Sequence, residues 1–319
     1  MDTAQVEERK FNPGICLLKL IACFGVVNSH FGAHGGELIT LPVPMFIFVS
    51  MFVGYGGIAG GAIAGRAKRL LFPFWAWGLF YFVAYCMFTH SFELDKLAWQ
   101  LTFGHSVCKP LFFLPLLFFY TILVYGVTHL GKYKEHAFWT LILVSFAMQY
   151  SGLNYAIFGS FPEEMRFTCG RVFECLPAVC AACLIKEHEC MLDKFKRQDV
   201  IAFFAVSLVA YYFVATNRLI PRGVGFTKQG FSLFLGTVLV SSAFIFIGRM
   251  ARQVTAKSLL MRFSSLSFGI YLLHVIVARF YEFAFGRQDN YVESVTIFIA
   301  SAVAVAVMSK IPYVKEFVK

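Results

Sequence analysis

The chain has little charge. Only 14% of its 319 residues are Asp, Glu, Lys or Arg and 59% are hydrophobic, whereas a soluble domain has roughly 25% charged and about 45–50% apolar residues. It also lacks a polar stretch of domain size and a Pro- or Ser-rich linker that would separate two halves. These absences exclude a soluble globular fold, and we expect a single integral membrane domain that covers residues 1–319.

Other classes are excluded by what the charged residues and cysteines do not form. The net charge of +10 is spread over short loops instead of a basic stripe, so no nucleic-acid binding is expected. Nine cysteines are an odd number and lie mostly in apolar runs, which argues against a disulfide framework. Cys180 and Cys183 form a C-x-x-C without a second ligand pair nearby, and no paired His/Glu motif occurs, so we predict no metal.

Long apolar runs recur from end to end. Each has about 20 residues, enough to cross roughly 30 Å of hydrocarbon as a helix. The expected spans are residues 14–32, 39–58, 70–88, 111–130, 137–157, 169–186, 199–215, 230–248, 263–285 and 292–309. The first follows ten polar residues, as in a signal peptide, but no small-residue cleavage site follows it, so we expect it to be retained. The pattern predicts an all-α, polytopic transmembrane helical bundle of about ten spans.

The loop charges predict the orientation. With a cytoplasmic N-terminus, the cytoplasmic segments hold 18 Lys and Arg residues and the opposite loops hold 7. Positive charge accumulates on the cytoplasmic side of membrane proteins. Both termini are therefore expected in the cytoplasm, which also fits an even number of spans.

Ionisable residues inside the spans are costly and are therefore candidates for function. Lys19 and His30 are eleven residues apart on the first span, which returns to nearly the same helix face about 16 Å further along the axis. Histidine has an unperturbed pKa near 6.5, so it can take a proton from a hydroxyl and return it at neutral pH. A snorkelling lysine and a histidine at a helix end would give the same pattern.

Further polar groups mark other spans. Arg66, Lys68 and Arg69 place three cations at the start of the third span, where they would hold phosphates or only anchor the helix. Two pairs of opposite charge with i, i+3 spacing can each neutralise themselves on one helix face. A third, polar pair with the same spacing shares one face of a later span. These pairs are Arg171 with Glu174, Arg279 with Glu282, and Tyr271 with His274.

Five motifs in order resemble the acyltransferase 3 family of integral membrane acyltransferases, over nearly the whole chain. The first two are Lys19 to His30, read as a basic residue, ten residues and a histidine, and the segment 42–50, which ends at Ser50. The others are the R-x-x-R of Arg66 to Arg69, the segment 111–117 and the segment 267–274. The chain departs from the family in having Lys19 where arginine is frequent and Met51 where a small residue follows the serine.

The resemblance implies O-acyl transfer, usually of acetyl, from cytoplasmic acetyl-CoA or another acyl-CoA to a hydroxyl of a surface or lipid-linked saccharide. It implies His30 as the catalytic histidine with Lys19 as its partner, and Arg66 and Arg69 as ligands of the coenzyme A phosphates. Ser50, Arg171, Glu174, Tyr271 and His274 are expected at the substrate site. The expected partners are a glycan acceptor and membrane lipids, and the expected location is the cell (inner) membrane.

Two other functions fit the same features. A secondary transporter of lipid-linked or small anionic substrates also has buried charges, and the glycines between residues 54 and 61 would mark a broken helix of the kind transporters use. A non-catalytic scaffold for glycan assembly would need the polar residues only for stability. The residues also leave open whether His30 acts as a base or first accepts the acyl group itself.

Overall fold

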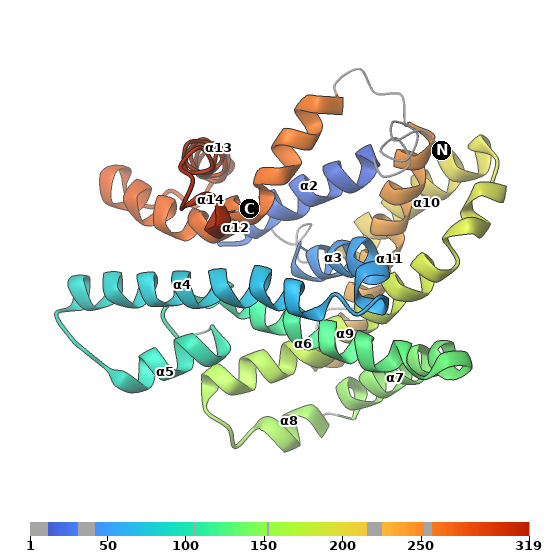
Figure 1. The fold of residues 1–319 in the computed structure, drawn as a ribbon, viewed down its shortest axis with the longest axis horizontal. Helices are drawn as coiled ribbons and strands as arrows, with labels where there is room; N and C mark the ends of the chain where they lie inside the picture. The colour runs from blue at the N-terminus through green and yellow to red at the C-terminus, as the bar shows by residue number, and fades with distance from the viewer. Residues whose placement is uncertain are drawn as a thin grey trace.

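The computed structural model describes residues 12–30, 42–104, 106–151, 153–215, 225–251 and 257–318. These residues form a bundle of helices and contain no strand (Figure 1). In chain order the elements are α2 (Pro13–His30), α3 (Pro42–Ala59), α4 (Ile63–Thr89), α5 (Leu94–Phe103), η2 (Lys109–Phe112), α6 (Phe113–Thr128), η3 (Gly131–Tyr133), α7 (Lys134–Tyr150), α8 (Leu153–Phe158), α9 (Glu163–Glu187), η4 (Glu189–Lys194), α10 (Arg197–Ala215), α11 (Gly225–Met250), α12 (Lys257–Phe285), α13 (Tyr291–Met308) and α14 (Lys315–Val318).

The all-α polytopic prediction is confirmed. Within the described residues, eight helices are long and apolar enough to cross a membrane. They are in α2, α3, α4, η2 with α6, α9, α11, α12 and α13. Helices α7 and α10 occupy the two other expected ranges without being among the eight, so the count of about ten spans stays a prediction, as do the cytoplasmic termini and the single domain.

Three features of the helices were not foreseen. Short helices α5, α8 and α14 lie between or after the spans. Helix α4 begins at Ile63, seven residues before the expected start of the third span at residue 70, so the R-x-x-R segment is helical. The glycines expected to break a helix do not interrupt α3, which runs to Ala59; the chain then turns at Gly60 and Gly61, where Gly61 has a φ of 82°.

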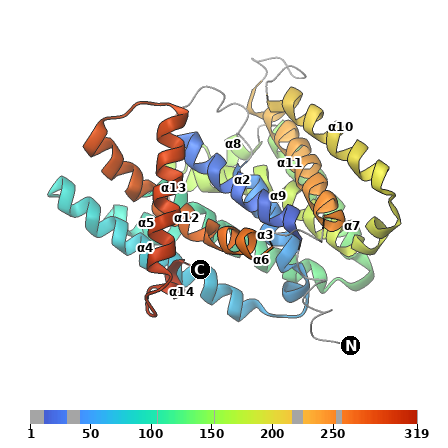
Figure 2. The same ribbon diagram turned by 90° about the horizontal axis from the view of Figure 1, so that it is seen from above.

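Helix α2 lies at the centre of the bundle. It packs against α3, α11, α12 and α13, and Figure 2 shows it between α11 on one side and α12 with α13 on the other. Its close approach to α11 depends on two glycines. A Cβ at Gly14 would lie 1.7 Å from the carbonyl oxygen of Phe244, and one at Gly248 would lie 2.3 Å from the Gly14 nitrogen. Small residues at such crossings allow helix backbones to meet inside a membrane.

Helix α12 is fixed against its neighbours through backbone carbonyls. The thiol of Cys23 in α2 donates to the Ser267 carbonyl at 3.3 Å, and the hydroxyl of Tyr81 in α4 donates to the Leu272 carbonyl at 2.7 Å. A Cβ at Gly269 would lie 2.6 Å from Val305 Cγ1, so α13 also approaches closely. Together these contacts determine how the C-terminal half of α12 lies beside the end of α2.

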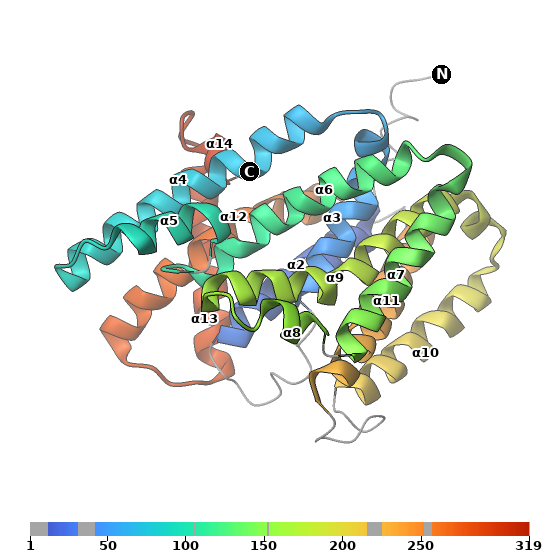
Figure 3. The same ribbon diagram turned by 90° about the horizontal axis from the view of Figure 1, so that it is seen from below.

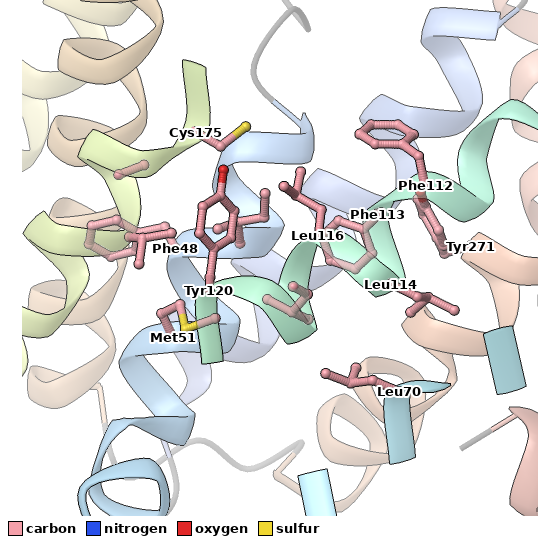
Figure 4. Packing of buried hydrophobic residues seen from close by; sticks show 14 of the residues in the cluster. Phe48, Met51, Leu70, Phe112, Phe113, Leu114, Leu116, Tyr120, Cys175 and Tyr271 are labelled. Atoms are coloured by element: carbon pink, nitrogen blue, oxygen red, sulfur yellow. The ribbon is translucent and has the colours of Figure 1, made fainter. Parts of the chain in front are cut away.

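The remaining helices complete the bundle on the far side of α3. Helices α4, α6, α9 and α7 follow one another there (Figure 3), and α9 also packs against α3. Around α6, Tyr120 and Leu116 pack with Phe48 and Met51 of α3 (Figure 4). Large apolar side chains on the outer faces, such as Phe80 at 52% exposure, face outward, as expected of surfaces in contact with lipid.

Candidate functional site

A cavity of about 290 Å³ lies at the end of α2. It is lined by His30, the last residue of α2, and by His274 of α12. The centroids of the two imidazole rings are 5.2 Å apart and the rings are inclined by 33°. His274 is fully buried, whereas His30 is exposed. The structure thus brings together two histidines that are 244 residues apart in the chain.

The orientation of the His274 ring follows from one hydrogen bond. Its Nδ1 lies 2.7 Å from the carbonyl oxygen of Tyr271, which can only accept. We therefore assign the proton of the neutral ring to Nδ1, which leaves a lone pair on Nε2. Nε2 has no hydrogen-bond partner among the described residues although it is buried. A buried acceptor of this kind needs a donor from water or a ligand.

One wall of the cavity is the segment 106–110, and two buried side chains position it. The side-chain oxygen of Gln100 accepts hydrogen bonds from the backbone N–H groups of Val107, at 2.6 Å, and Cys108, at 3.0 Å. The hydroxyl of Tyr271 donates to the carbonyl of Pro110. Because α5 and α12 both fix the segment, it is a built wall instead of a free loop.

The aromatic face of Tyr271 continues this support into the core. Its ring lies 5.2 Å from that of Phe113 and 6.0 Å from that of Phe46, measured between centroids. Figure 4 shows Tyr271 beside Phe112 and Phe113 at the start of α6. Tyr271 therefore supports the cavity without being one of the side chains that line it.

Charged side chains surround the cavity. Lys109, Arg279 and Arg287 contribute three cations, and Glu282 contributes the one carboxylate. Arg279 pairs with Glu282 at 3.0 Å. Arg287 pairs with Asp289 at 2.6 Å, and its Nη2 also donates to the His30 carbonyl at 3.4 Å. The pair with Asp289 raises the pKa of Arg287, so this side chain stays charged at neutral pH.

Arg66 forms a second polar site inside the bundle. Its side chain is buried, Nε donates to the Thr121 hydroxyl at 2.8 Å, and Nη2 donates to the Ser50 hydroxyl at 3.1 Å and the Ser50 carbonyl at 3.3 Å. A Cβ at Gly54 would lie 1.9 Å from Nη1, so the missing side chain there makes room for the guanidinium. The structure thus joins the predicted residues Arg66 and Ser50, while Arg69 is exposed on the same helix.

The other predicted residues lie elsewhere. Lys19 is half-buried on α2 and does not line the cavity. Arg171 and Glu174 form an ion pair at 2.5 Å on α9, and neither lines the cavity. The roles predicted for these three residues stay predictions, as do those predicted for His30, Ser50, Arg66, Arg69, Tyr271 and His274.

Sequence reasoning assigned no role to several residues of the cavity. Cys108 and Lys109 lie three and two residues before the motif at residues 111–117, which was the available signal for them. Arg279 and Glu282 were predicted only as a pair that neutralises itself. At about 100° per residue they lie roughly 140° and 80° around the helix from His274, so their spacing gave no signal for a shared site.

Comparisons with known proteins place the chain in a family. The sequence model of the acyltransferase 3 family, described as an acyltransferase domain, matches residues 12–310. Neither the comparison with curated proteins nor that with solved structures gave a match. The matched range includes both histidines of the cavity and the Arg66 site. The chain therefore belongs to the acyltransferase 3 family and is an integral, multi-pass membrane acyltransferase.

Proposed function

We propose that the protein is an O-acyltransferase that moves an acyl group, in the first place acetyl, from cytoplasmic acyl-coenzyme A to a hydroxyl of a surface or lipid-linked saccharide. Membership of an acyltransferase family supports acyl transfer. The observation that carries the proposal is the pair of imidazoles of His30 and His274 at one cavity, because a positioned imidazole is the most frequent group for proton transfer at neutral pH.

In the proposed reaction His30 acts as the general base. It accepts the proton of the acceptor hydroxyl while the hydroxyl oxygen attacks the thioester carbon. A C–O bond forms, the C–S bond breaks, and the proton passes from His30 to the departing thiolate of coenzyme A. Because His30 lines the cavity, its imidazole can meet a saccharide that enters there. Proton transfer by a positioned group contributes about 10²- to 10⁴-fold to a rate.

The donor would enter from the opposite end of α2. Lys19 is eleven residues before His30, about 16 Å along the axis, which is too far for both to act on one carbonyl. We place Lys19 along the path of the donor instead of at the reacting carbon. Because Arg69 is exposed, it would contact the coenzyme A phosphates first. A guanidinium group can donate two parallel hydrogen bonds to two oxygens of one phosphate. Arg66, held by Ser50 and Thr121, would add positive charge from the interior.

The test is transfer and hydrolysis of radiolabelled acetyl-coenzyme A by purified protein in liposomes. We compare the wild type with His30→Ala, and use His136→Ala as the control because His136 is exposed on α7, and does not line the cavity. We expect His30→Ala to lower the rate at least 100-fold and His136→Ala to leave it unchanged. A His30→Ala protein of normal rate would overturn the role of His30. A wild type that neither releases nor transfers label would overturn the proposal and make transport the function to test.

A further inference from the structure

The charges around the cavity are unequal. Arg279 and Arg287 each have a carboxylate partner, Glu282 and Asp289 respectively. Lys109 is exposed, and its ammonium pairs with no carboxylate of the described residues. With Asp289 counted beside the lining, three cations stand against two carboxylates. The ammonium of Lys109 is therefore the positive charge of the lining that no carboxylate of the described residues compensates.

The surroundings strengthen this charge. Val107, Pro110, Val275 and Ala278 also line the cavity, and such apolar walls lower the local dielectric constant. A cleft with a net charge of one sign concentrates ligands of the opposite sign and raises their rate of association. An anionic ligand thus gains more here than at an isolated lysine on an open surface.

The buried His274 requires a hydrogen-bond donor instead of an anion. His274 is one of the residues that line the cavity, and its buried Nε2 carries a lone pair with no partner among the described residues. The group that satisfies it is a donor such as a hydroxyl. A ligand that fills the whole cavity therefore combines a hydroxyl for His274 with an anionic group for the cations.

We propose that this cavity binds the acceptor of the reaction and selects a saccharide that carries a carboxylate or a phosphate. Lys109 and Arg279 hold the anionic group, and His274 Nε2 accepts a hydrogen bond from a sugar hydroxyl, which places the sugar beside His30. The volume of about 290 Å³ is at the lower end of the range of ligand pockets, roughly 300–1,000 Å³, so the cavity accommodates a terminal sugar and not a long glycan. The inference rests on the proposed function only in calling the bound saccharide the acceptor, because binding of the saccharide is measured independently of catalysis.

Binding to the purified wild-type protein in detergent is measured first, by isothermal titration calorimetry. The probes are trigalacturonic acid and its methyl ester, which has the same sugars without the charge. A second pair, glucose 1-phosphate and glucose, separates a phosphate from a carboxylate. We expect the charged member of at least one pair to bind at least tenfold more tightly than the neutral member, and the difference to shrink as the salt concentration rises. Equal affinity within both pairs overturns the proposal.

Variants then locate the site. Lys109→Glu reverses a charge of the lining, and Lys310→Glu makes the same change at an exposed lysine outside the lining. We expect Lys109→Glu to weaken binding of the charged probe at least tenfold and to leave binding of the neutral probe unchanged. We expect Lys310→Glu to alter neither affinity. Equal affinities of the Lys109→Glu and wild-type proteins for the charged probe would show that the anion binds elsewhere.

The two proposals fail in different ways. If the charged probe binds as expected but no label is transferred or released from acetyl-coenzyme A, the proposed function is wrong and the anionic site stands. If the wild type hydrolyses acetyl-coenzyme A through His30 but does not prefer the charged probes, the acyltransferase proposal stands and the anionic acceptor is wrong.

Discussion

The wall of the cavity depends on one buried amide, and its removal gives a measurable change at one cysteine. Gln100 accepts hydrogen bonds from the backbone of Val107 and Cys108, while its own side-chain nitrogen has no partner among the described residues. Replacing it with methionine keeps a long side chain but removes the acceptor. Two backbone donors then lose their partner, one buried and one half-buried.

The size of the effect follows from the burial of these donors. A buried donor without a partner costs about 1–3 kcal/mol. The Cys108 N–H bears most of this cost and the Val107 N–H is partly solvated, so together we expect about 2–4 kcal/mol. If this cost appears as easier local opening of the wall, the open population rises about 30- to 900-fold, at 1.36 kcal/mol for each factor of ten.

The thiol of Cys108 reports this opening because it is only 2% exposed in the closed wall. We propose to follow its alkylation by N-ethylmaleimide with peptide mass spectrometry, in folded protein in detergent. The rate at Cys108 should rise by the stated factor in Gln100→Met. The rate at Cys175, fully buried on α9, should not change. Gln100→Glu keeps a side-chain oxygen that can accept both bonds, and should preserve most of the protection.

An unchanged rate at Cys108 in Gln100→Met would refute this reasoning, since the two hydrogen bonds would then contribute nothing to the closed wall. Equal increases at Cys108 and Cys175 would also refute it, because they would indicate global unfolding instead of a local change.

Three further predictions follow from other contacts. Tyr271→Phe removes the hydrogen bond to the Pro110 carbonyl. This variant should raise the KM for the acceptor several-fold, while binding of coenzyme A, measured by equilibrium dialysis, stays the same. A change in donor binding alone would contradict this prediction. Arg66→Lys keeps the charge but cannot reproduce the guanidinium geometry. The KM for acetyl-coenzyme A should therefore rise about tenfold, which is equivalent to about 1.4 kcal/mol. An unchanged KM would exclude Arg66 from donor binding. The hydrogen bond from Lys96 lowers the pKa of Glu93, so this contact is complete above the ordinary carboxyl pKa and is lost as the pH falls through the lowered value. The protection factors of the α5 amides, which correct for the intrinsic pH dependence of exchange, should therefore fall in acid, and Glu93→Gln should abolish this fall.

Part of the site could be read from residue spacing alone. Tyr271 and His274 share a helix face because they are three residues apart, and the Nδ1 bond to the Tyr271 carbonyl is a local contact of that helix. The spacing of Lys19 and His30 likewise predicted a shared face, but the axial distance between them leaves only His30 at the cavity. Periodicity thus indicates which direction a side chain takes and not what it meets.

The charge motif at the start of the third span shows the same limit. Three cations in four residues predicted a basic cluster, and Arg69 is indeed exposed. The burial of Arg66 was not predictable, because it depends on Ser50 of α3, Thr121 of α6 and the empty space beside Gly54. A sequence pattern cannot show that a cation turns inward until the neighbouring helices are placed.

By itself the sequence determined that this protein lies in a lipid bilayer, and the bilayer in turn determines its fold class. Apolar runs of about 20 residues cannot be dissolved in water, and inside a bilayer each backbone polar group must be satisfied within its own segment, which a helix achieves. Only the tertiary structure decided which polar groups meet. The pairing of His30 with His274, and the wall that Gln100 and Tyr271 hold beside them, depend on the packing of α2, α5 and α12. The physical reason is that contacts between helices depend on close packing between segments that are distant in the chain. The periodicity of a single helix carries no information about that packing.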